Sequence, residues 1–149
     1  MSRVILSTKI FVFNEKDEIL VLRRSETHPH KPHHTDLPGG IIEPNEHEQT
    51  AALRELKEET GLEVDEKLAN IFYADTSMFP SGNSLTMLMY HIRLDHTPDV
   101  TISWEHESYE WCSSDKLLAR EDLEEPERRG LEYALANDLL GLRNPETVG

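Results

Sequence analysis

Three glutamates lie close together in one stretch that the sequence predicts to be helical. Glu55, Glu58 and Glu59 are three and four positions apart, and residues at that spacing share a helix face. Carboxylates held so close repel one another and raise each other's pKa unless a cation lies among them. Because Arg54 and Lys57 are expected to lie off that face, the stretch predicts a hard divalent metal ion bound by oxygen ligands.

The glutamates belong to a longer pattern that runs from Gly40 to Leu62. Its fixed positions are Gly40, Glu46, Arg54, Glu55, Leu56, Glu58, Glu59, Gly61 and Leu62. This pattern resembles the Nudix box at every position. A surface helix rich in Glu and Lys, stabilised by weak charge pairs, is the plain alternative. That alternative explains the charge but not two glycines and an arginine at fixed offsets.

The resemblance implies a metal site for Mg²⁺, with Mn²⁺ as a second candidate. Glu58 and Glu59 correspond to the main ligands, and Glu55 and the carbonyl of Gly40 complete or share the site. Gly39 is the preceding glycine, and it is expected to leave the backbone bare where substrate approaches.

Three further residues are predicted around this site. By resemblance, Glu46 and Arg54 pair behind the ligands and brace the loop against the helix. Arg54 is also expected to hold Glu55 and Glu58 in place by charge-assisted hydrogen bonds. Arg24 closes a predicted strand that borders the cleft in the Nudix fold, and its guanidinium is suited to clamping phosphate oxygens. The alternative for Arg24 is a solvated strand end.

The general base is left open among several residues. Glu55 and Glu58 qualify, and so do Glu105, His106 and Glu107, because in many Nudix enzymes the corresponding loop returns to the metal site. The segment EHESYEWCSSDKLLA resembles GDP-mannose hydrolases, in which a histidine matches His106. Those enzymes depart from the standard box, which this chain keeps.

A histidine-rich loop, residues 28–34, precedes the box. Its four histidines suggest a transition metal, but their spacing matches no standard zinc pattern and no cysteine accompanies them. A substrate-facing or solvated loop is therefore the favoured interpretation. Coenzyme A pyrophosphatases have a similar frame here, but they require Arg where this chain has Pro29 and Gly where it has His33, so coenzyme A is not assigned.

The remaining pattern predicts an α/β chain, and it resembles the Nudix fold, a mixed β-sheet sandwiched between α-helices. Strands are expected at residues 4–13, 18–23, 67–79, 84–94 and within 104–112, with helices at 47–60, 113–119 and 126–140. Tyr109 and Trp111 are expected in the core. Gly61 is expected to cap the first helix and Gly141 to end the last, whose buried face carries Leu131, Leu135 and Leu139, followed by a frayed tail.

Composition sets outer limits on function. The 149 residues suggest a single domain, 1–149, and no apolar run is long enough to span a membrane. The single Cys112 and the absence of a signal-peptide pattern favour a cytoplasmic protein. A net charge of −14 argues against binding a nucleic-acid polymer, although bound cations let an acidic protein take a small polyphosphate. A homodimer is left open because dimers are common in this family.

Together these features predict hydrolysis of the phosphoanhydride bond in a nucleoside diphosphate linked to another group, such as a (d)NTP, a nucleotide sugar or ADP-ribose. A non-catalytic nucleotide-sensing module on the same fold is the main alternative, although such modules usually lose box glutamates. An isoprenoid diphosphate isomerase requires a cysteine near residues 36–40, and Cys112 is elsewhere in the sequence.

Overall fold

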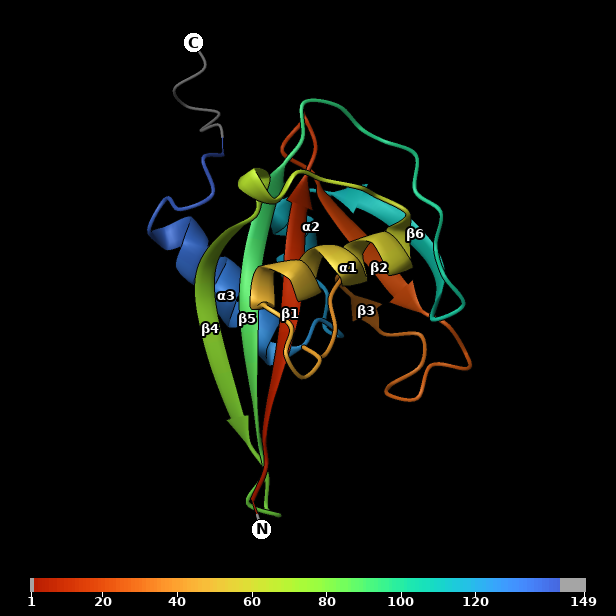
Figure 1. The fold of residues 1–149 in the computed structure, drawn as a ribbon. Helices are drawn as coiled ribbons and strands as arrows, with labels where there is room; N and C mark the ends of the chain where they lie inside the picture. The colour runs from red at the N-terminus through yellow and green to blue at the C-terminus, as the bar shows by residue number, and fades with distance from the viewer. Residues whose placement is uncertain (1, 143–149) are drawn as a thin grey trace.

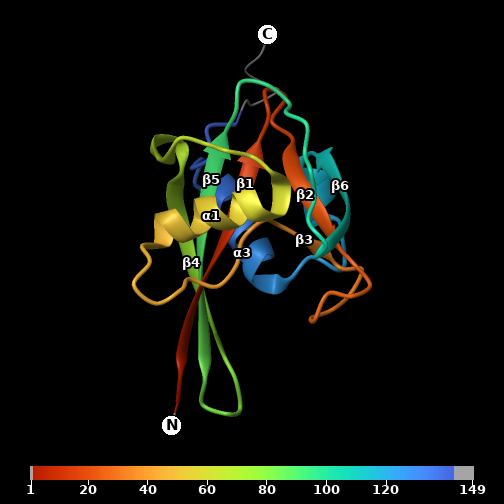
Figure 2. The ribbon, with the colours of Figure 1, turned by 45° about the vertical axis from the view of Figure 1, so that its right-hand side comes forward.

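The computed structural model describes residues 2–142 and places a mixed six-stranded sheet between helices (Figures 1 and 2). The strands are β1 (Val4–Phe13), β2 (Ile19–Arg24), β3 (Thr35–Asp36), β4 (Asn70–Met78), β5 (Ser84–Arg93) and β6 (His106–Cys112). The helices are α1 (Glu48–Thr60), the short 3₁₀ helix η1 (Glu66–Leu68), α2 (Ser114–Leu118) and α3 (Glu125–Ala136). The predicted α/β sandwich is confirmed.

The sheet opens between β1 and β2, and this opening positions the box. The strand order is β3-β2-β1-β5-β4, with β6 paired to β2. β1 and β2 pair only beside their connecting turn, and residues 35–42 fill the gap that follows. The carbonyls of Pro38 and Gly40 accept the N–H groups of Ile10 and Thr8, each at 2.8 Å. The residues leading into α1 are thus held inside the sheet.

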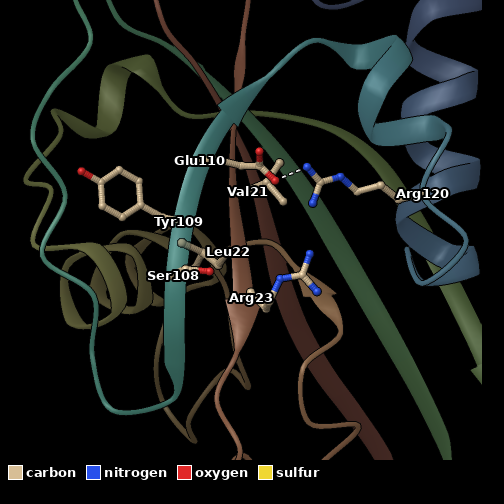
Figure 3. A pocket seen from close by; sticks show the side chains of 7 residues that line it. All are labelled: Val21, Leu22, Arg23, Ser108, Tyr109, Glu110 and Arg120. Carbon is tan, nitrogen blue, oxygen red and sulfur yellow. Dashed lines mark hydrogen bonds and ion pairs between the residues drawn. The ribbon is translucent and has the colours of Figure 1, made fainter.

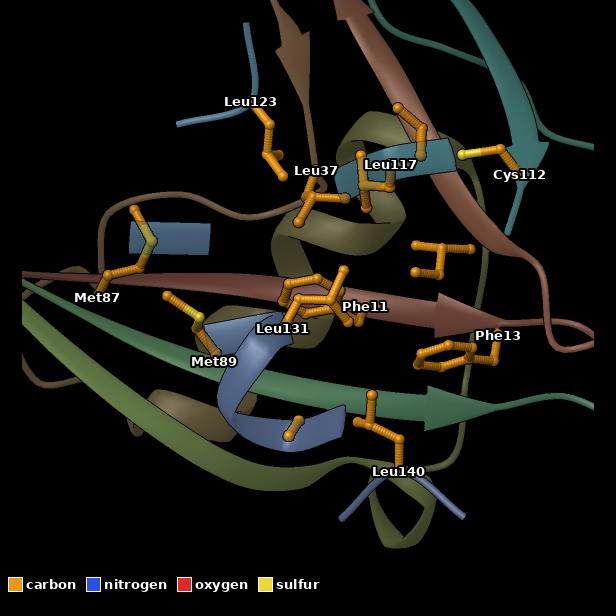
Figure 4. Close-up of a cluster of buried hydrophobic side chains, with 13 residues drawn as sticks. Phe11, Phe13, Leu37, Met87, Met89, Cys112, Leu117, Leu123, Leu131 and Leu140 are labelled. Carbon is orange, nitrogen blue, oxygen red and sulfur yellow. The ribbon is translucent and has the colours of Figure 1, made fainter. Parts of the chain in front are cut away.

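Alternation along β1 divides the interior into two cores. Ile10 and Val12 face α1, where they pack with Ala52 and Leu56. Phe11 and Phe13 face the other side, in the cluster that α2 and α3 cover (Figure 4). The same alternation places Lys9 on the α3 side, in line with the two phenylalanines.

Several predicted boundaries are confirmed. β1 spans Val4–Phe13, Gly61 caps α1 with a φ of 75°, and the Ser113 hydroxyl accepts the Lys116 N–H at the start of α2. The stretch predicted as one strand over residues 67–79 instead contains part of η1 before β4 begins at Asn70. β5 lies between β1 and β4, in the interior of the sheet as expected.

The prediction that Tyr109 is a core residue is wrong. Trp111 packs beside the α1-side core, but Tyr109 is 40% exposed. β6 pairs with β2 alone and is an edge strand. The face alternation was therefore read correctly, but α1 does not reach far enough to cover this part of the edge.

The last helix also differs from its prediction. α3 ends at Ala136 with Asn137 as its C-cap, so Gly141 does not terminate it. Leu135 and Leu139 are exposed, and the buried face instead carries Glu127, Gly130, Leu131 and Ala134. That set follows helical spacing of three and four residues. The predicted frayed tail lies almost wholly outside the described residues. Within residues 2–142, no helix has the length and apolar character needed to cross a membrane.

Candidate active site

The box carboxylates, Glu55, Glu58 and Glu59, project from the C-terminal half of α1 beside the glycine turn, residues 37–40. A Cβ atom on Gly40 would lie 2.5 to 2.7 Å from the carboxyl atoms of Glu55, so a side chain there would displace that carboxylate. The N–H of Gly39 donates to Glu59 Oε2 at 3.4 Å. The turn and the acidic face of α1 are therefore in direct contact.

Arg54 donates hydrogen bonds to three glutamates at this site. Its Nε and Nη2 donate to the two carboxylate oxygens of Glu46 at 2.7 and 3.0 Å. Its Nη1 donates to Glu55 at 3.0 Å and to Glu58 at 3.3 Å. The expectation that Arg54 lies off the acidic face is therefore wrong, because one guanidinium contacts two of the box carboxylates. Lys57 does lie apart and pairs with Glu63.

Glu59 keeps a negative environment that Arg54 does not relieve. Its side chain is buried, whereas Glu58 is 57% exposed. Burial raises the pKa of Glu59 to about 9, and repulsion from Asp36 and Glu55 adds to this, although Lys9 acts in the opposite direction. The carboxylates thus exceed the positive charge available to them.

The carbonyls of the glycine turn do not all face the same way. The Gly40 carbonyl accepts the Thr8 N–H at 2.8 Å and the Thr8 hydroxyl at 3.3 Å, so it faces β1. Within residues 2–142, the Gly39 carbonyl has no hydrogen-bond partner. Gly39 is therefore better placed than Gly40 to offer a backbone oxygen to a ligand.

A second polar cluster lies across the turn and is centred on Asp36. Lys9 Nζ donates to Asp36 Oδ1 at 2.7 Å, His106 Nε2 lies 2.9 Å from Oδ2, and Arg24 Nε lies 3.3 Å from Oδ2. Burial alone would raise the pKa of Asp36, but Lys9, His106 and Arg24 hold it well below the usual range. Asp36 with these three partners is called the Asp36 cluster below.

The Asp36 cluster contains two of the predicted site residues. Arg24, predicted to contact phosphate, is largely buried and also donates to the His30 carbonyl at 3.1 Å. The side chain of His106, a candidate base, is 1% exposed. A general base must reach the water that it deprotonates, so this position favours a structural part for His106.

The other candidate bases face the histidine-rich loop. Glu105 Oε2 lies 3.9 Å from His28 Nε2, and Glu107 Oε1 lies 2.8 Å from His33 Nδ1. The contacts described for Glu105 and Glu107 do not include the box carboxylates. Among residues 2–142, Glu55 and Glu58 are thus the candidate bases that lie on the acidic face itself.

Three polar residues near the site were not predicted from the sequence. Lys9, Asp36 and Glu127 are all buried. Burial raises the pKa of Glu127 to about 7, despite the opposing effect of Lys9. Each had a weak signal in the sequence, since Lys9 interrupts an apolar strand, Asp36 directly precedes the Leu-Pro-Gly-Gly turn and Glu127 falls on the apolar face of α3.

A separate pocket of about 280 Å³ opens where β2 meets β6. Arg23 and Arg120 lie on the same side of the two strands, and Tyr109 points to the other side (Figure 3). Arg120 pairs with Glu110 across this pocket. None of the predicted metal ligands lines it.

The donor set of the acidic face fits a hard divalent cation. It offers carboxylate oxygens, the ligands that Mg²⁺ and Mn²⁺ prefer, and it carries more negative charge than Arg54 and Lys9 offset. Within residues 2–142, no three His, Cys, Asp or Glu side chains are gathered as a ready-made metal cage. In this arrangement Arg54 donates to both Glu55 and Glu58.

Comparison with known proteins identifies the family. A family model described as the NUDIX domain matches residues 5–134. A bis(5'-nucleosyl)-tetraphosphatase [asymmetrical] of Caenorhabditis elegans is 29% identical over 111 residues, which cover 74% of this chain and 78% of that protein. The Rattus norvegicus protein of the same description is 28% identical over 116 residues, 76% of each chain.

Solved structures agree with this assignment. A MutT protein from Methanosarcina mazei Go1 superposes with a TM-score of 0.81 at 29% identity, covering 92% of this chain and 96% of that one. A C. elegans Ap4A hydrolase binary complex gives a TM-score of 0.65 at 25% identity, with 91% and 99% covered. The chain belongs to the Nudix family and is a pyrophosphohydrolase that acts on phosphoanhydride bonds.

Proposed function

We propose that the protein uses Mg²⁺, or Mn²⁺ in its place, to hydrolyse the diphosphate bond of a nucleoside diphosphate linked to another group. The observation that carries this proposal is the excess of carboxylate charge on α1 beside a glycine turn that Arg54 braces from behind. When bound, the metal would neutralise the diphosphate and lower the pKa of an attacking water.

Each residue of the acidic face has its own part in this proposal. Glu58 and Glu59 bind the metal, with Glu55 completing or sharing the site. The free carbonyl of Gly39 is the backbone ligand that the geometry favours, in place of the predicted Gly40 carbonyl. Arg54 and Glu46 hold these groups in place through their paired hydrogen bonds.

Glu55 or Glu58 takes the proton of the attacking water in this proposal. Glu58 is the more exposed of the two and therefore the more accessible to solvent water. Glu105 and Glu107 stay as secondary candidates, because they are engaged with the histidine-rich loop. Movement of that loop would release them.

A dinucleoside polyphosphate is the first substrate to test. The curated relatives from C. elegans and Rattus norvegicus are both described as bis(5'-nucleosyl)-tetraphosphatases, and each aligns over about three quarters of this chain. Such a substrate contains the phosphoanhydride bond that the acidic face suits. A (d)NTP, a nucleotide sugar and ADP-ribose complete the set, because the box does not discriminate among them.

The expectations for location, partner and oligomeric state remain proposals. A cytoplasmic location rests on the lone Cys112, which is a free and buried thiol. The partner is a small nucleotide and no nucleic-acid polymer, given the net charge of −14. A homodimer stays open.

A substrate panel with purified protein tests the proposal. Release of phosphate, pyrophosphate or mononucleotide is measured for each compound with Mg²⁺, with Mn²⁺ and with chelator. Turnover that requires the metal supports hydrolysis. Turnover that persists unchanged in the presence of chelator would overturn the proposed metal dependence.

A further inference from the structure

Lys9 interrupts an otherwise apolar strand face. Phe11 and Phe13 follow it on the same side of β1 and pack into the core, yet Lys9 is itself only 9% exposed. Replacing a buried ion pair by apolar residues is often neutral or stabilising. Stability alone therefore does not account for a lysine at this position. A charged residue on an otherwise apolar strand face is expected where the residue positions a functional site.

The contacts of Lys9 close a small ring around the start of the glycine turn. Its Nζ donates to Asp36 Oδ1 at 2.7 Å and to the Leu37 carbonyl at 3.0 Å. The Leu37 N–H donates to the same Asp36 oxygen at 2.9 Å. One ammonium thus fixes both the side chain before the turn and the first carbonyl within it.

Asp36 does not depend on Lys9 alone for charge compensation. Arg24 lies 3.3 Å from Asp36 Oδ2, and His106 Nε2 lies 2.9 Å from the same oxygen. A second cation therefore stays beside the carboxylate if Lys9 is removed. Among the residues that the structure describes, Lys9 alone donates to the Leu37 carbonyl.

That contact completes the attachment of the turn to β1. The Pro38 carbonyl is held by Ile10 N–H and the Gly40 carbonyl by Thr8 N–H. Lys9 Nζ donates to the carbonyl of Leu37. Of the four carbonyls of the turn, residues 37–40, the Gly39 carbonyl is then the one that has no donor within residues 2–142. A Cβ on Gly39 would lie 2.8 Å from Lys9 Cα, which shows how tightly the turn packs on this strand.

We propose that Lys9 is a positioning residue, which fastens the glycine turn to β1 so that Gly39 presents its N–H to Glu59 and its carbonyl to the metal side. The part of this inference that concerns turnover rests on the proposed function. The part that concerns the turn itself does not.

Local hydrogen exchange tests the turn directly. The amides of Thr8 and Ile10 report on it, because they donate to Gly40 and Pro38, and the Leu94 amide, bonded to Phe13 at the far end of β1, reports on the rest of the strand. In Lys9→Met, the Thr8 and Ile10 amides should exchange at least about tenfold faster while Leu94 is unchanged. Lys16→Met, at an exposed lysine in the β1–β2 turn, is the matched control and should change none of them.

Steady-state kinetics test the consequence for catalysis. With saturating metal, Lys9→Met should lower kcat at least about tenfold and leave KM within about twofold, because misplaced catalytic groups cost rate more than binding. Unchanged exchange at Thr8 and Ile10 would overturn the proposal. Faster exchange with a wild-type kcat would overturn its link to catalysis.

The experiments also cover two other outcomes, an inactive wild type and a Lys9→Met variant that does not fold. If the wild type hydrolyses no compound of the panel, the proposed function fails, and the exchange measurement alone still decides whether Lys9 holds the turn. If Lys9→Met does not fold, Lys9→Gln, which has a neutral side chain one bond shorter and cannot reach both oxygens, carries the same measurements and the same expected results.

Discussion

Two polar clusters lie on either side of the glycine turn, and their charge balance is opposite. The box carboxylates on α1 number three, and Arg54 contacts two of them while Glu58 stays 57% exposed. The Asp36 cluster has one carboxylate, and Lys9, Arg24 and His106 surround it, all largely buried. The first cluster has fewer cations than carboxylates and opens to solvent at Glu58, and it is called the open cluster below. In the Asp36 cluster the carboxylate charge is compensated and its groups are buried, and it is called the closed cluster below.

This difference separates two uses of buried charge. A carboxylate whose charge is compensated needs no further cation, so it can hold backbone in place, which is the part proposed for the Asp36 cluster. An incomplete cluster of oxygen donors attracts a cation, which is the part proposed for the box. The comparison predicts that damage to the box carboxylates lowers turnover while the fold persists. Damage to the Asp36 cluster should instead lower stability or, at Lys9, loosen the glycine turn and reduce turnover through that change.

The largest effect is expected at the open cluster. Glu58→Gln removes one ligand charge from an exposed position, so the fold should persist while kcat/KM falls roughly a thousandfold or more. Initial rates with Mg²⁺ and the best substrate of the panel measure it. Glu132→Gln, an exposed glutamate on α3, is the control and should behave as wild type. A folded Glu58→Gln protein with wild-type rates would remove Glu58 from the site.

The closed cluster should respond in stability. Asp36→Asn leaves Lys9 and Arg24 as buried charges without their carboxylate, and breaking a buried pair in this way costs about 3 to 5 kcal/mol. Urea unfolding gives the free energy of unfolding. A loss below about 1 kcal/mol would show that the cluster does not hold the backbone as described.

The pH dependence of the free energy of unfolding gives a further test at Glu127, a buried glutamate whose pKa Lys9 influences. Burial raises its pKa to about 7 from an ordinary value of 4.5, so the stability that neutral Glu127 allows is present below pH 4.5 and is lost as pH rises through 7. Glu127→Gln removes this loss. Its free energy of unfolding, relative to wild type, should therefore increase by roughly 2 kcal/mol between pH 5 and pH 8.

The measurement for Glu127 is a series of urea melts across that pH range. Glu132→Gln again serves as the control, since its side chain is exposed and should show no such trend. A difference between Glu127→Gln and wild type that does not vary with pH would mean that Glu127 is already ionised freely in the folded protein.

The smallest effect is expected away from both clusters. The Ser113 hydroxyl accepts the Lys116 N–H at the start of α2, so Ser113→Ala should cost about 1 kcal/mol of stability and leave kcat unchanged. Thermal unfolding and initial rates check this. A change in kcat would show that α2 is coupled to the site, against the separation drawn above.

The open cluster could be predicted from the sequence because its members are local. The box residues occupy one helix and the turn before it, so fixed spacing and helical periodicity place them together. The longer strands of the sheet followed from β-branched and aromatic runs in the same way. The two-residue strand β3, Thr35–Asp36, was not predicted, because it lies in a polar stretch. Tyr109 and Leu135 were misplaced because periodicity gives a face but not how far a neighbouring element covers it.

The closed cluster could not be predicted in this way, because its members meet only through the sheet. Asp36 is 27 positions from Lys9 and 70 positions from His106. Their meeting depends on the divergence of β1 and β2 and on the bulge between Arg23 and Arg24 opposite β6. His106 was consequently kept among the candidate bases through the resemblance of its segment, although topology places it against Asp36.

Mn²⁺ titration followed by NMR tests the central claim most directly, since the paramagnetic ion broadens the amide signals nearest to it. Substoichiometric Mn²⁺ should first broaden Gly39, Gly40 and the amides of Glu55 to Thr60 at the C-terminal half of α1, and Glu58→Gln should weaken this effect. Broadening that begins instead in the histidine-rich loop, residues 28–34, would contradict the assignment of the metal to the open cluster.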